Sequence, residues 1–394
     1  MANFGTVFAS PAFIRVGRGI TLSLGELLKP RNVKKVMFVT DPGIASLKLD
    51  EPVRQSLEAA GIAVAVYNKV SPDPTLEQAK ELIGMLKADL PDMVIGFGGG
   101  SSIDVAKIAA VMVNNTTDLR DLVGVNLVPN PGLPTLFIPT TAGTGSEATN
   151  VSVLNDVERG VKLGIVSEHM YAHTVLIDPE LTVSLPPRMT SWTGLDALIH
   201  AIEAYVSRAA TPITDTLAVR SMELIAKYLR KAYAVGENME AREGMLTASL
   251  LAGMAFTNTQ CGGAHACALA VGARYHLAHG LATTLMLPAT MEFNLIAAPE
   301  KYKHIAEIFG YCTEGMSPYE AAAMSIDAVT GLAKDMDFVF GLENYGGSED
   351  HVPDLAKLSI PPARLWNSNP RPVNLEQVEK ILRRSFGDWP KYEG

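Results

Sequence analysis

The stretch from Cys261 to Gly280, CGGAHACALAVGARYHLAHG, concentrates side chains that bind metal ions. It contains His265, His276 and His279, three of the eight histidines in the whole chain. His265 lies in a run of small residues typical of a tightly packed helix, and His279 precedes a glycine at a predicted helix break. Imidazole nitrogens are ligands of Zn(II), Fe(II), Mn(II) and Co(II). The cluster therefore predicts a divalent metal site.

A second segment, residues 194–203 (GLDALIHAIE), supplies further ligands. Asp196 and His200 are four residues apart within an apolar spacing typical of a helix, so both point from one helical face. Glu203 follows about one turn later and is a candidate partner for a ligand. One carboxylate with three imidazoles leaves room for a substrate oxygen, as in catalytic metal sites. The alternative is that Asp196 caps a helix locally and the histidines are ordinary core or surface groups.

The chain has three cysteines, Cys261, Cys267 and Cys312. So few cysteines in 394 residues argue against a disulfide scaffold and favour a reducing compartment, so we expect a cytoplasmic protein. Cys261 and Cys267 flank His265, which makes them alternative metal ligands. Small buried thiols are, however, common in protein interiors.

Length and charge restrict the class of protein. A chain of 394 residues predicts two domains. Its net charge of −9 disfavours an extended surface for nucleic acid or anionic membranes. No apolar run is long enough to span a membrane. We therefore expect a small-molecule substrate and no nucleic-acid or membrane partner.

The first half of the chain alternates β-rich runs with amphipathic segments. The predicted strands are Phe13–Val16, Lys35–Thr40, Ala63–Tyr67, Met93–Phe97 and Thr135–Pro139. The predicted helices are Ile20–Leu28, Pro52–Ala60, Leu76–Leu86 and Ser102–Val113. Such alternation predicts a mostly parallel sheet, which binds ligands at the carboxyl ends of its strands.

A glycine-rich loop, GFGGGSSID (96–104), follows one predicted strand and opens a helix. Its glycines let backbone N–H groups approach a pyrophosphate at the helix N-terminus. Ser101 occupies the last position of the usual G-x-G-x-x-G pattern, and Asp41 precedes the glycines instead of following them. These departures predict a different α/β nucleotide fold. Asp41 either caps a helix or accepts a hydrogen bond from a ribose 2′-hydroxyl, and the second role favours NAD over NADP.

A second polar stretch, PTTAGTGSE (139–147), combines hydroxyl groups with glycines. This composition suits contacts to ribose, phosphate and nicotinamide. Lys162, in GVKLGIV, either neutralises part of the nucleotide or is a solvated surface lysine.

The sequence changes character after residue 178. Pro186 and Pro187 interrupt the chain, and the remainder is rich in Ala, Leu, Met, Glu and Lys at helical spacing. We place a domain boundary near Leu185. The expected domains are an α/β NAD-binding domain at 1–184 and a helical metal-binding and substrate domain at 185–394.

Four motifs in combination make the chain resemble the iron-containing (group III) alcohol dehydrogenase family over roughly residues 8–390. They are GGGSSIDVAK (98–107), IPTTAGTGSEAT (138–149), GLDALIHAIEAY (194–205) and the pair His265 and His279. The resemblance implies a dehydroquinate synthase-like architecture. An N-terminal α/β dinucleotide-binding domain is then followed by an all-helical metal-binding domain, and the protein forms a homodimer or a larger homo-oligomer.

The resemblance also assigns the site residues. The implied metal ligands are Asp196, His200, His265 and His279, with Fe(II) the usual metal and Zn(II) used by some relatives. The expected cofactor is NAD, and Asp41 makes NADP the less favoured alternative. The matching cofactor positions are Asp41, Asp73, Gly98, Gly99, Gly100, Ser101, Thr140, Thr141, Thr144, Thr149 and Lys162.

One departure from the family concerns proton transfer. Many members carry a second histidine one turn after His265, where this chain has Leu269. That histidine is associated with the substrate pocket, so Leu269 indicates a more apolar pocket. His276 is a candidate replacement as a proton relay, and its alternative is an ordinary surface histidine.

The leading hypothesis is a metal-dependent oxidoreductase that interconverts a small alcohol and its aldehyde or ketone with NAD(H). One alternative is a dehydroquinate-synthase-like lyase, which would use NAD and a metal without net NADH production. A lyase of that kind would need basic residues to hold a phosphorylated substrate. The other alternative is a non-catalytic protein that binds NAD or a metal.

Overall fold

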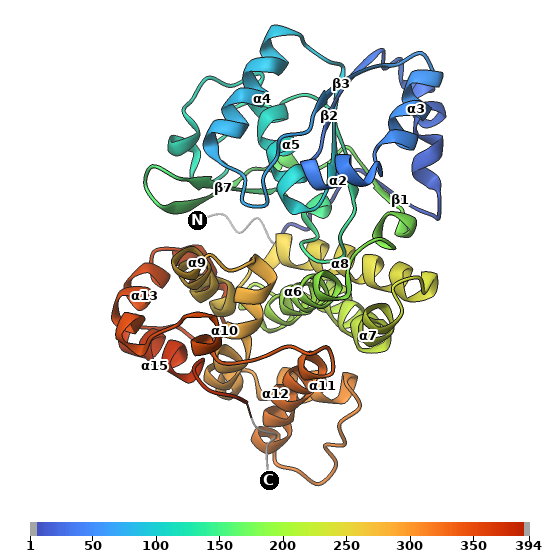
Figure 1. The fold of residues 1–394 in the computed structure, drawn as a ribbon. Coiled ribbons are helices and arrows are strands. Elements are labelled where there is room, and N and C mark those ends of the chain that lie inside the picture. The colour runs from blue at the N-terminus through green and yellow to red at the C-terminus, as the bar shows by residue number, and fades with distance from the viewer. Residues whose placement is uncertain (1–5, 390–394) are drawn as a thin grey trace. The chain divides into compact units, whose positions relative to one another are not determined.

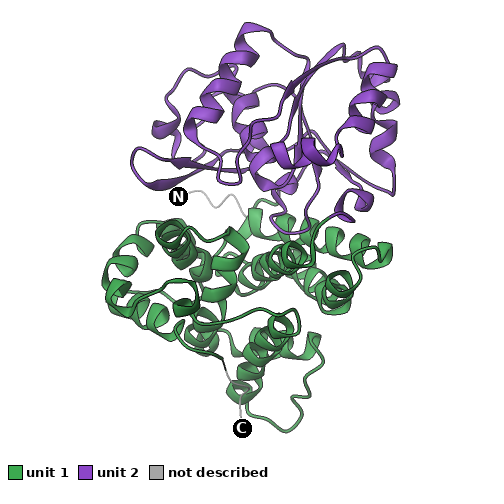
Figure 2. Ribbon diagram, in the orientation of Figure 1, with its two compact units in different colours: residues 1–8, 185–394 green, residues 9–184 purple. Residues whose placement is uncertain are grey.

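A computed structural model describes residues 6–389, so the outermost ends of the two predicted domains lie outside the described residues. The chain divides into two compact units between Ser184 and Leu185 (Figure 2). One unit is Ala9–Ser184, and the other contains Leu185 onward together with the chain before Ala9.

The unit Ala9–Ser184 contains a six-stranded parallel sheet with the order β1-β9-β6-β4-β2-β3. Its strands are β1 (Phe13–Val16), β2 (Lys35–Val39), β3 (Ala63–Tyr67), β4 (Met93–Gly98), β6 (Thr135–Pro139) and β9 (Thr174–Ile177). All residues of the central strands β4 and β6 are buried, as expected for a parallel sheet covered on both faces. The predicted mostly parallel sheet is confirmed.

Five α-helices belong to the same unit (Figure 1). They are α1 (Leu24–Leu28), α2 (Pro42–Leu47), α3 (Glu51–Ala59), α4 (Leu76–Ala88) and α5 (Gly100–Met112). Helix α5 packs against β4 and β6 and is buried over nearly its whole length. Since α5 starts directly after β4, its N-terminus lies at the carboxyl edge of the sheet.

A second, three-stranded sheet was not predicted from the sequence. It contains β5 (Gly124–Val125), β7 (Val151–Asp156) and β8 (Val161–Val166), with β7 and β8 antiparallel. Along β7, every second residue is buried, which is the alternation of a strand with one covered face. The hairpin carries Lys162.

From Leu185 on, the described residues of the second unit form helices joined by loops, with no strand. Its helices are α6 (Pro187–Val206), α7 (Pro212–Ala234), α8 (Met239–Thr259), α9 (Gly263–Tyr275), α10 (His279–Asn294), α11 (Pro299–Ile308), α12 (Pro318–Lys334), α13 (Val352–Ser359), α14 (Ala363–Ser368) and α15 (Leu375–Arg384). Within the described part of the chain, none of the helices is long and apolar enough to cross a membrane.

Helix α6 is the central helix of this unit and packs against α7, α8 and α10. Every residue from Gly194 to Val206 is buried. A helix buried on all sides normally carries apolar residues, because a polar group without a partner loses its hydration. The acidic and imidazole side chains on α6 therefore need partners inside the unit.

Candidate functional site

Helix α6 presents Asp196 and His200 one turn apart, as the sequence predicts. Their side chains are only 3% and 5% exposed. The His200 ring stacks on Phe256 from α8, with 4.3 Å between the ring centroids. This stacking restricts the orientation of the imidazole within the core.

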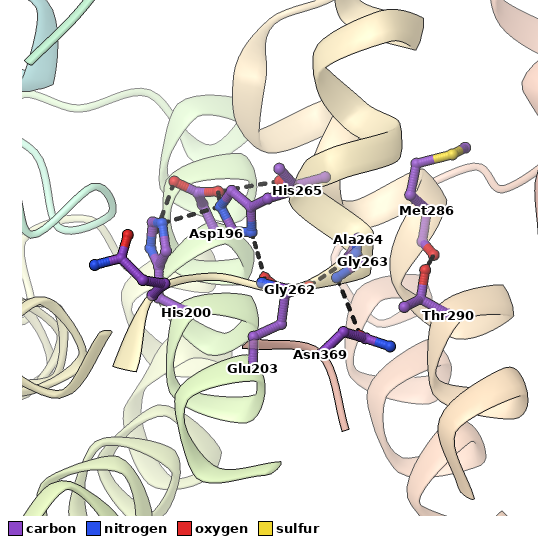
Figure 3. Close-up of polar contacts among 12 residues, drawn as sticks. Asp196, His200, Glu203, Gly262, Gly263, Ala264, His265, Met286, Thr290 and Asn369 are labelled. Atoms are coloured by element: carbon purple, nitrogen blue, oxygen red, sulfur yellow. Dashed lines mark hydrogen bonds and ion pairs between the residues drawn. The ribbon is translucent and has the colours of Figure 1, made fainter. Parts of the chain in front are cut away.

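Two further helices bring His265 and His279 to this pair. Their Nε2 atoms lie 3.9 Å and 3.7 Å from Oδ1 of Asp196. Nε2 of His265 is also 3.0 Å from Nε2 of His200 (Figure 3). One ligand atom from each of the four residues lies within 4.8 Å of all the others. His279 is the most exposed member, with 40% of its side chain accessible.

Gly280 makes this arrangement sterically possible. It follows His279 at the start of α10, where the backbone runs against α6. A Cβ atom at Gly280 would lie 2.4 Å from the carbonyl oxygen of Trp192 and 3.5 Å from Cβ of Asp196. Only glycine therefore lets the start of α10 approach α6 this closely.

The ionisation states of Asp196 and His200 favour the binding of a cation. Burial by itself would raise the pKa of Asp196, but the surrounding histidines and the Thr283 hydroxyl, 3.0 Å away, hold that pKa below its ordinary value. Burial lowers the pKa of His200 to about 4, so this imidazole is neutral at pH 7 and keeps a lone pair. The cluster thus combines an ionised carboxylate with a neutral imidazole.

The pKa of His265 is shifted in the opposite direction to that of His200. Burial alone would lower its pKa, but Cys261 and Glu203 raise that pKa well above the ordinary value. A metal ion at its Nε2 must therefore displace a proton, which makes metal affinity rise with pH.

The four side chains fit a divalent metal ion. Among the described residues, Nδ1 of His200 is buried without a hydrogen-bond partner, 3.9 Å from Oδ2 of Asp196. Three imidazoles and a carboxylate are the donor set that Fe(II) and Zn(II) accept. All four residues singled out as ligands from the sequence are thus brought together.

The two cysteines beside His265 differ. Burial raises the pKa of Cys267 to about 12, so its thiol stays protonated and is a poor metal ligand. Cys261 forms a second compact group with Glu203 and His265. In that group, both carboxylate oxygens of Glu203 already accept hydrogen bonds.

His276, the candidate proton relay, lies outside the group of four. It is exposed and ends α9 with a left-handed backbone conformation, φ 54°. Its role stays a prediction.

In the other unit, the glycine-rich loop combines a positive φ with close contacts to residues 141 and 144. Gly98 has φ +146°, a conformation that residues with a side chain rarely adopt. A Cβ atom at Gly100 would lie 2.8 Å from Cγ2 of Thr144, and one at Gly99 would contact Thr141. The loop and the polar stretch 139–147 therefore meet at the carboxyl edge of the sheet.

The remaining predicted nucleotide residues lie at the same edge. Asp41 caps α2 through the Ile44 N–H at 3.0 Å, and its Oδ2 would lie 3.1 Å from a Cβ atom at Gly98. Asp73 pairs with Lys162 at 2.6 Å. The other three contact backbone or buried groups nearby: Ser101 donates to the Pro72 carbonyl, the Thr140 N–H donates to the Gly98 carbonyl, and Thr149 accepts from Lys107.

A buried charge network behind this loop was not predicted from the sequence. Lys107 is 1% exposed, and its ammonium group donates to Ser146, Thr149 and the Val151 carbonyl at 2.7–2.9 Å. Burial raises the pKa of neighbouring Glu147 to about 7, and its Oε1 has no hydrogen-bond partner among the described residues. The sequence signal for Lys107 is its position in helix segment 105–112, which is otherwise apolar.

Two family models match the chain. The model described as iron-containing alcohol dehydrogenase matches residues 11–179. The model described as the C-terminal part of the Fe-containing alcohol dehydrogenase family matches residues 190–386. Together they cover both compact units.

Similar proteins match over nearly their full length. A sulfoacetaldehyde reductase of Bilophila wadsworthia is 44% identical over 94% of this chain and 96% of its own. An NAD-dependent methanol dehydrogenase of Bacillus methanolicus is 39% identical over 98% of this chain and 100% of its own. The crystal structure of a 1,3-propanediol oxidoreductase has a TM-score of 0.94 at 36% identity and covers 97% of this chain and 100% of that one.

Proposed function

This chain belongs to the iron-containing alcohol dehydrogenase family, and from that premise we propose that Asp196, His200, His265 and His279 hold its catalytic metal ion. The family resemblance is confirmed. So are the two-part architecture, the oxidoreductase class and the use of NAD(H) with a divalent metal. The lyase and non-catalytic alternatives are correspondingly disfavoured. The observation that carries the ligand assignment is the convergence of four ligand atoms within 4.8 Å.

The cluster prepares the site for a substrate oxygen. A divalent ion held by these four residues would supply Lewis acidity at this oxygen. Asp196 provides the negative charge that offsets the ion, and the Thr283 hydroxyl fixes one carboxylate oxygen. Phe256 holds the ring of His200 in place. These contacts keep the ligands oriented before substrate arrives.

We also propose that residues 98–101 bind the pyrophosphate of NAD at the N-terminus of α5. The supporting observations are the positive φ of Gly98 and the start of α5, where Gly99 supplies no side-chain cap to the first backbone N–H groups. Asp41 would accept from the adenosine ribose and disfavour NADP. The nicotinamide ring of NAD supplies or accepts the hydride.

The proposed substrates are short aldehydes and their primary alcohols. Relatives at 35–44% identity are a sulfoacetaldehyde reductase, a methanol dehydrogenase, 1,3-propanediol dehydrogenases and a lactaldehyde reductase. Leu269, half-buried on α9 one turn after His265, would present an apolar surface to the substrate. The proposed proton route includes the exposed His276.

We further propose a cytoplasmic homo-oligomer, with a homodimer as its simplest form. All three cysteines are free, which suits a reducing compartment. The edge strand β1 exposes Phe13 and Val16 at 52% and 50%, an apolar strip that a second copy would cover. Light scattering after gel filtration tests the oligomeric state.

The ligand assignment is tested with Asp196→Asn and His279→Ala. Both variants should lose NADH-dependent aldehyde reduction and retain wild-type NADH affinity, because the nucleotide residues belong to the other unit. Full turnover in both variants would contradict the proposed metal centre.

A further inference from the structure

Glu203 is a buried carboxylate on α6 that receives three hydrogen bonds. Its side chain is 5% exposed. The N–H groups of Gly262 and Ala264 donate to it at 2.8 Å each, and Nδ1 of His265 lies 2.6 Å from its Oε2 (Figure 3). Such a set of donors is what a buried charge requires.

The carboxylate fixes the tautomer of His265. An ionised carboxylate only accepts hydrogen bonds, so Nδ1 of His265 must carry a proton and donate it. A neutral imidazole then has its single lone pair on Nε2. That atom faces Asp196, His200 and His279. With Nδ1 as the acceptor instead, the lone pair would point away from the cluster.

The same carboxylate fixes the backbone from which His265 projects. Gly262 and Ala264 flank the first residue of α9, where helical N–H groups lack partners within the helix. Gly263 between them donates to Oδ1 of Asn369 at 3.2 Å. Glu203 and Asn369 therefore anchor the start of α9, but only Glu203 also contacts the imidazole.

We infer that Glu203 is a positioning residue, which holds the ring and the tautomer of His265 so that Nε2 faces the metal centre. The inference rests on the proposed function, since it takes His265 as a ligand. A hydrogen-bonded carboxylate behind a metal-ligating histidine raises the basicity of the ligand and prevents ring rotation. Because Nδ1 of His265 carries a proton in this arrangement, the group of Glu203, Cys261 and His265 does not bind a metal ion.

The main test compares Glu203→Gln with Asn369→Ser in metal-stripped protein titrated with Co(II) against a competing chelator. Glutamine presents one acceptor and one N–H₂ group where the protein supplies three donors, so at least one donor faces an N–H₂ group and the charged acceptor behind Nδ1 is lost. Co(II) affinity should fall about 10- to 100-fold in Glu203→Gln. Asn369→Ser also perturbs the start of α9 but leaves the Nδ1 acceptor, so its Co(II) affinity should stay near wild type.

A measurement on the Zn(II)-loaded wild-type protein needs no variant. With ¹⁵N-labelled histidine, the NMR spectrum should show His265 protonated at Nδ1, with a hydrogen-bonded proton that exchanges slowly. A spectrum with the His265 proton on Nε2 would overturn the inference, even if Glu203→Gln does not fold.

Two further variants separate the possible failures. If Asp196→Asn loses Co(II) and Glu203→Gln binds it like wild type, the metal centre stands and the role of Glu203 is refuted. If Asp196→Asn binds Co(II) like wild type, the proposed metal centre itself fails. If Cys261→Ser loses Co(II), the ion occupies the Glu203–Cys261–His265 group and the inference is overturned.

Discussion

Gly280→Ala tests whether the close approach of α10 to α6 sets the metal centre. The added Cβ would lie 2.4 Å from the carbonyl oxygen of Trp192, whereas ordinary contact begins at 3.4 Å, so the start of α10 must move by about 1 Å. Because this oxygen belongs to the backbone of α6, it cannot move aside as a flexible side chain would.

The displacement falls on His279, the neighbour of Gly280, whose Nε2 is 3.7 Å from Oδ1 of Asp196. A shift of about 1 Å far exceeds the few tenths of an ångström that metal–ligand bonds tolerate. Turnover should fall about 100-fold, as expected for misplacement on this scale. The free energy of unfolding should fall by about 1–3 kcal/mol from overpacking.

The assays are the Co(II) dissociation constant, the kcat for aldehyde reduction and the NADH dissociation constant. Gly272→Ala is the matched control, because its Cβ would lie 3.5 Å from Cβ of Ala282, an ordinary contact between α9 and α10. The control should keep its Co(II) affinity and gain about 0.5–1 kcal/mol of stability, as a helical glycine replaced by alanine does. Wild-type Co(II) affinity and kcat in Gly280→Ala, with NADH affinity unchanged, would refute the steric argument.

Three other predictions concern charge and hydrogen bonding. Burial raises the pKa of Glu147 from 4.5 to about 7, so the folded state holds this proton more tightly than the unfolded chain does. The stability that this proton contributes is complete below about pH 4.5 and is lost as the pH rises through about 7. Above that pH, the free energy of unfolding of Glu147→Gln should exceed that of wild type by about 3 kcal/mol. Urea unfolding at pH 5 and pH 8 measures this difference. Equal pH dependence in both proteins would contradict the assignment. Thr283→Val removes the donor to Asp196 and should weaken Co(II) binding several-fold at a cost of about 1 kcal/mol in stability, whereas unchanged affinity in chelator competition would show that the hydroxyl is dispensable. Because the pKa of His265 is raised well above its ordinary value in the metal-free protein, Co(II) affinity should rise with pH, and a flat pH profile in chelator competition would contradict proton displacement.

Local sequence patterns predict much of this molecule. The strand Ala63–Tyr67 has the predicted bounds, because a run of apolar residues closed by turn signals determines a strand locally. The placement of Asp196 and His200 on one face follows from their spacing alone. The family motifs add the identities of the two remaining metal-ligand candidates, His265 and His279, which no local rule selects over His276.

Other features depend on tertiary packing and leave little trace in the sequence. The burial of Lys107 depends on its contact with the loop that contains Ser146, which is 39 residues later in the chain. The need for glycine at position 280 arises from Trp192, which is 88 residues earlier in the chain. Glu203 was identified as a possible partner of a ligand. Its contact with His265 depends on how α9 packs against α6.

The most direct test of the central claim is the rate of NADH oxidation with sulfoacetaldehyde, lactaldehyde and other short aldehydes. The protein is stripped of metal and then reloaded anaerobically with Fe(II), with Zn(II) or with no metal. We predict that turnover requires metal and that Asp196→Asn removes it. Equal turnover by stripped and reloaded protein would contradict the role of this cluster in catalysis.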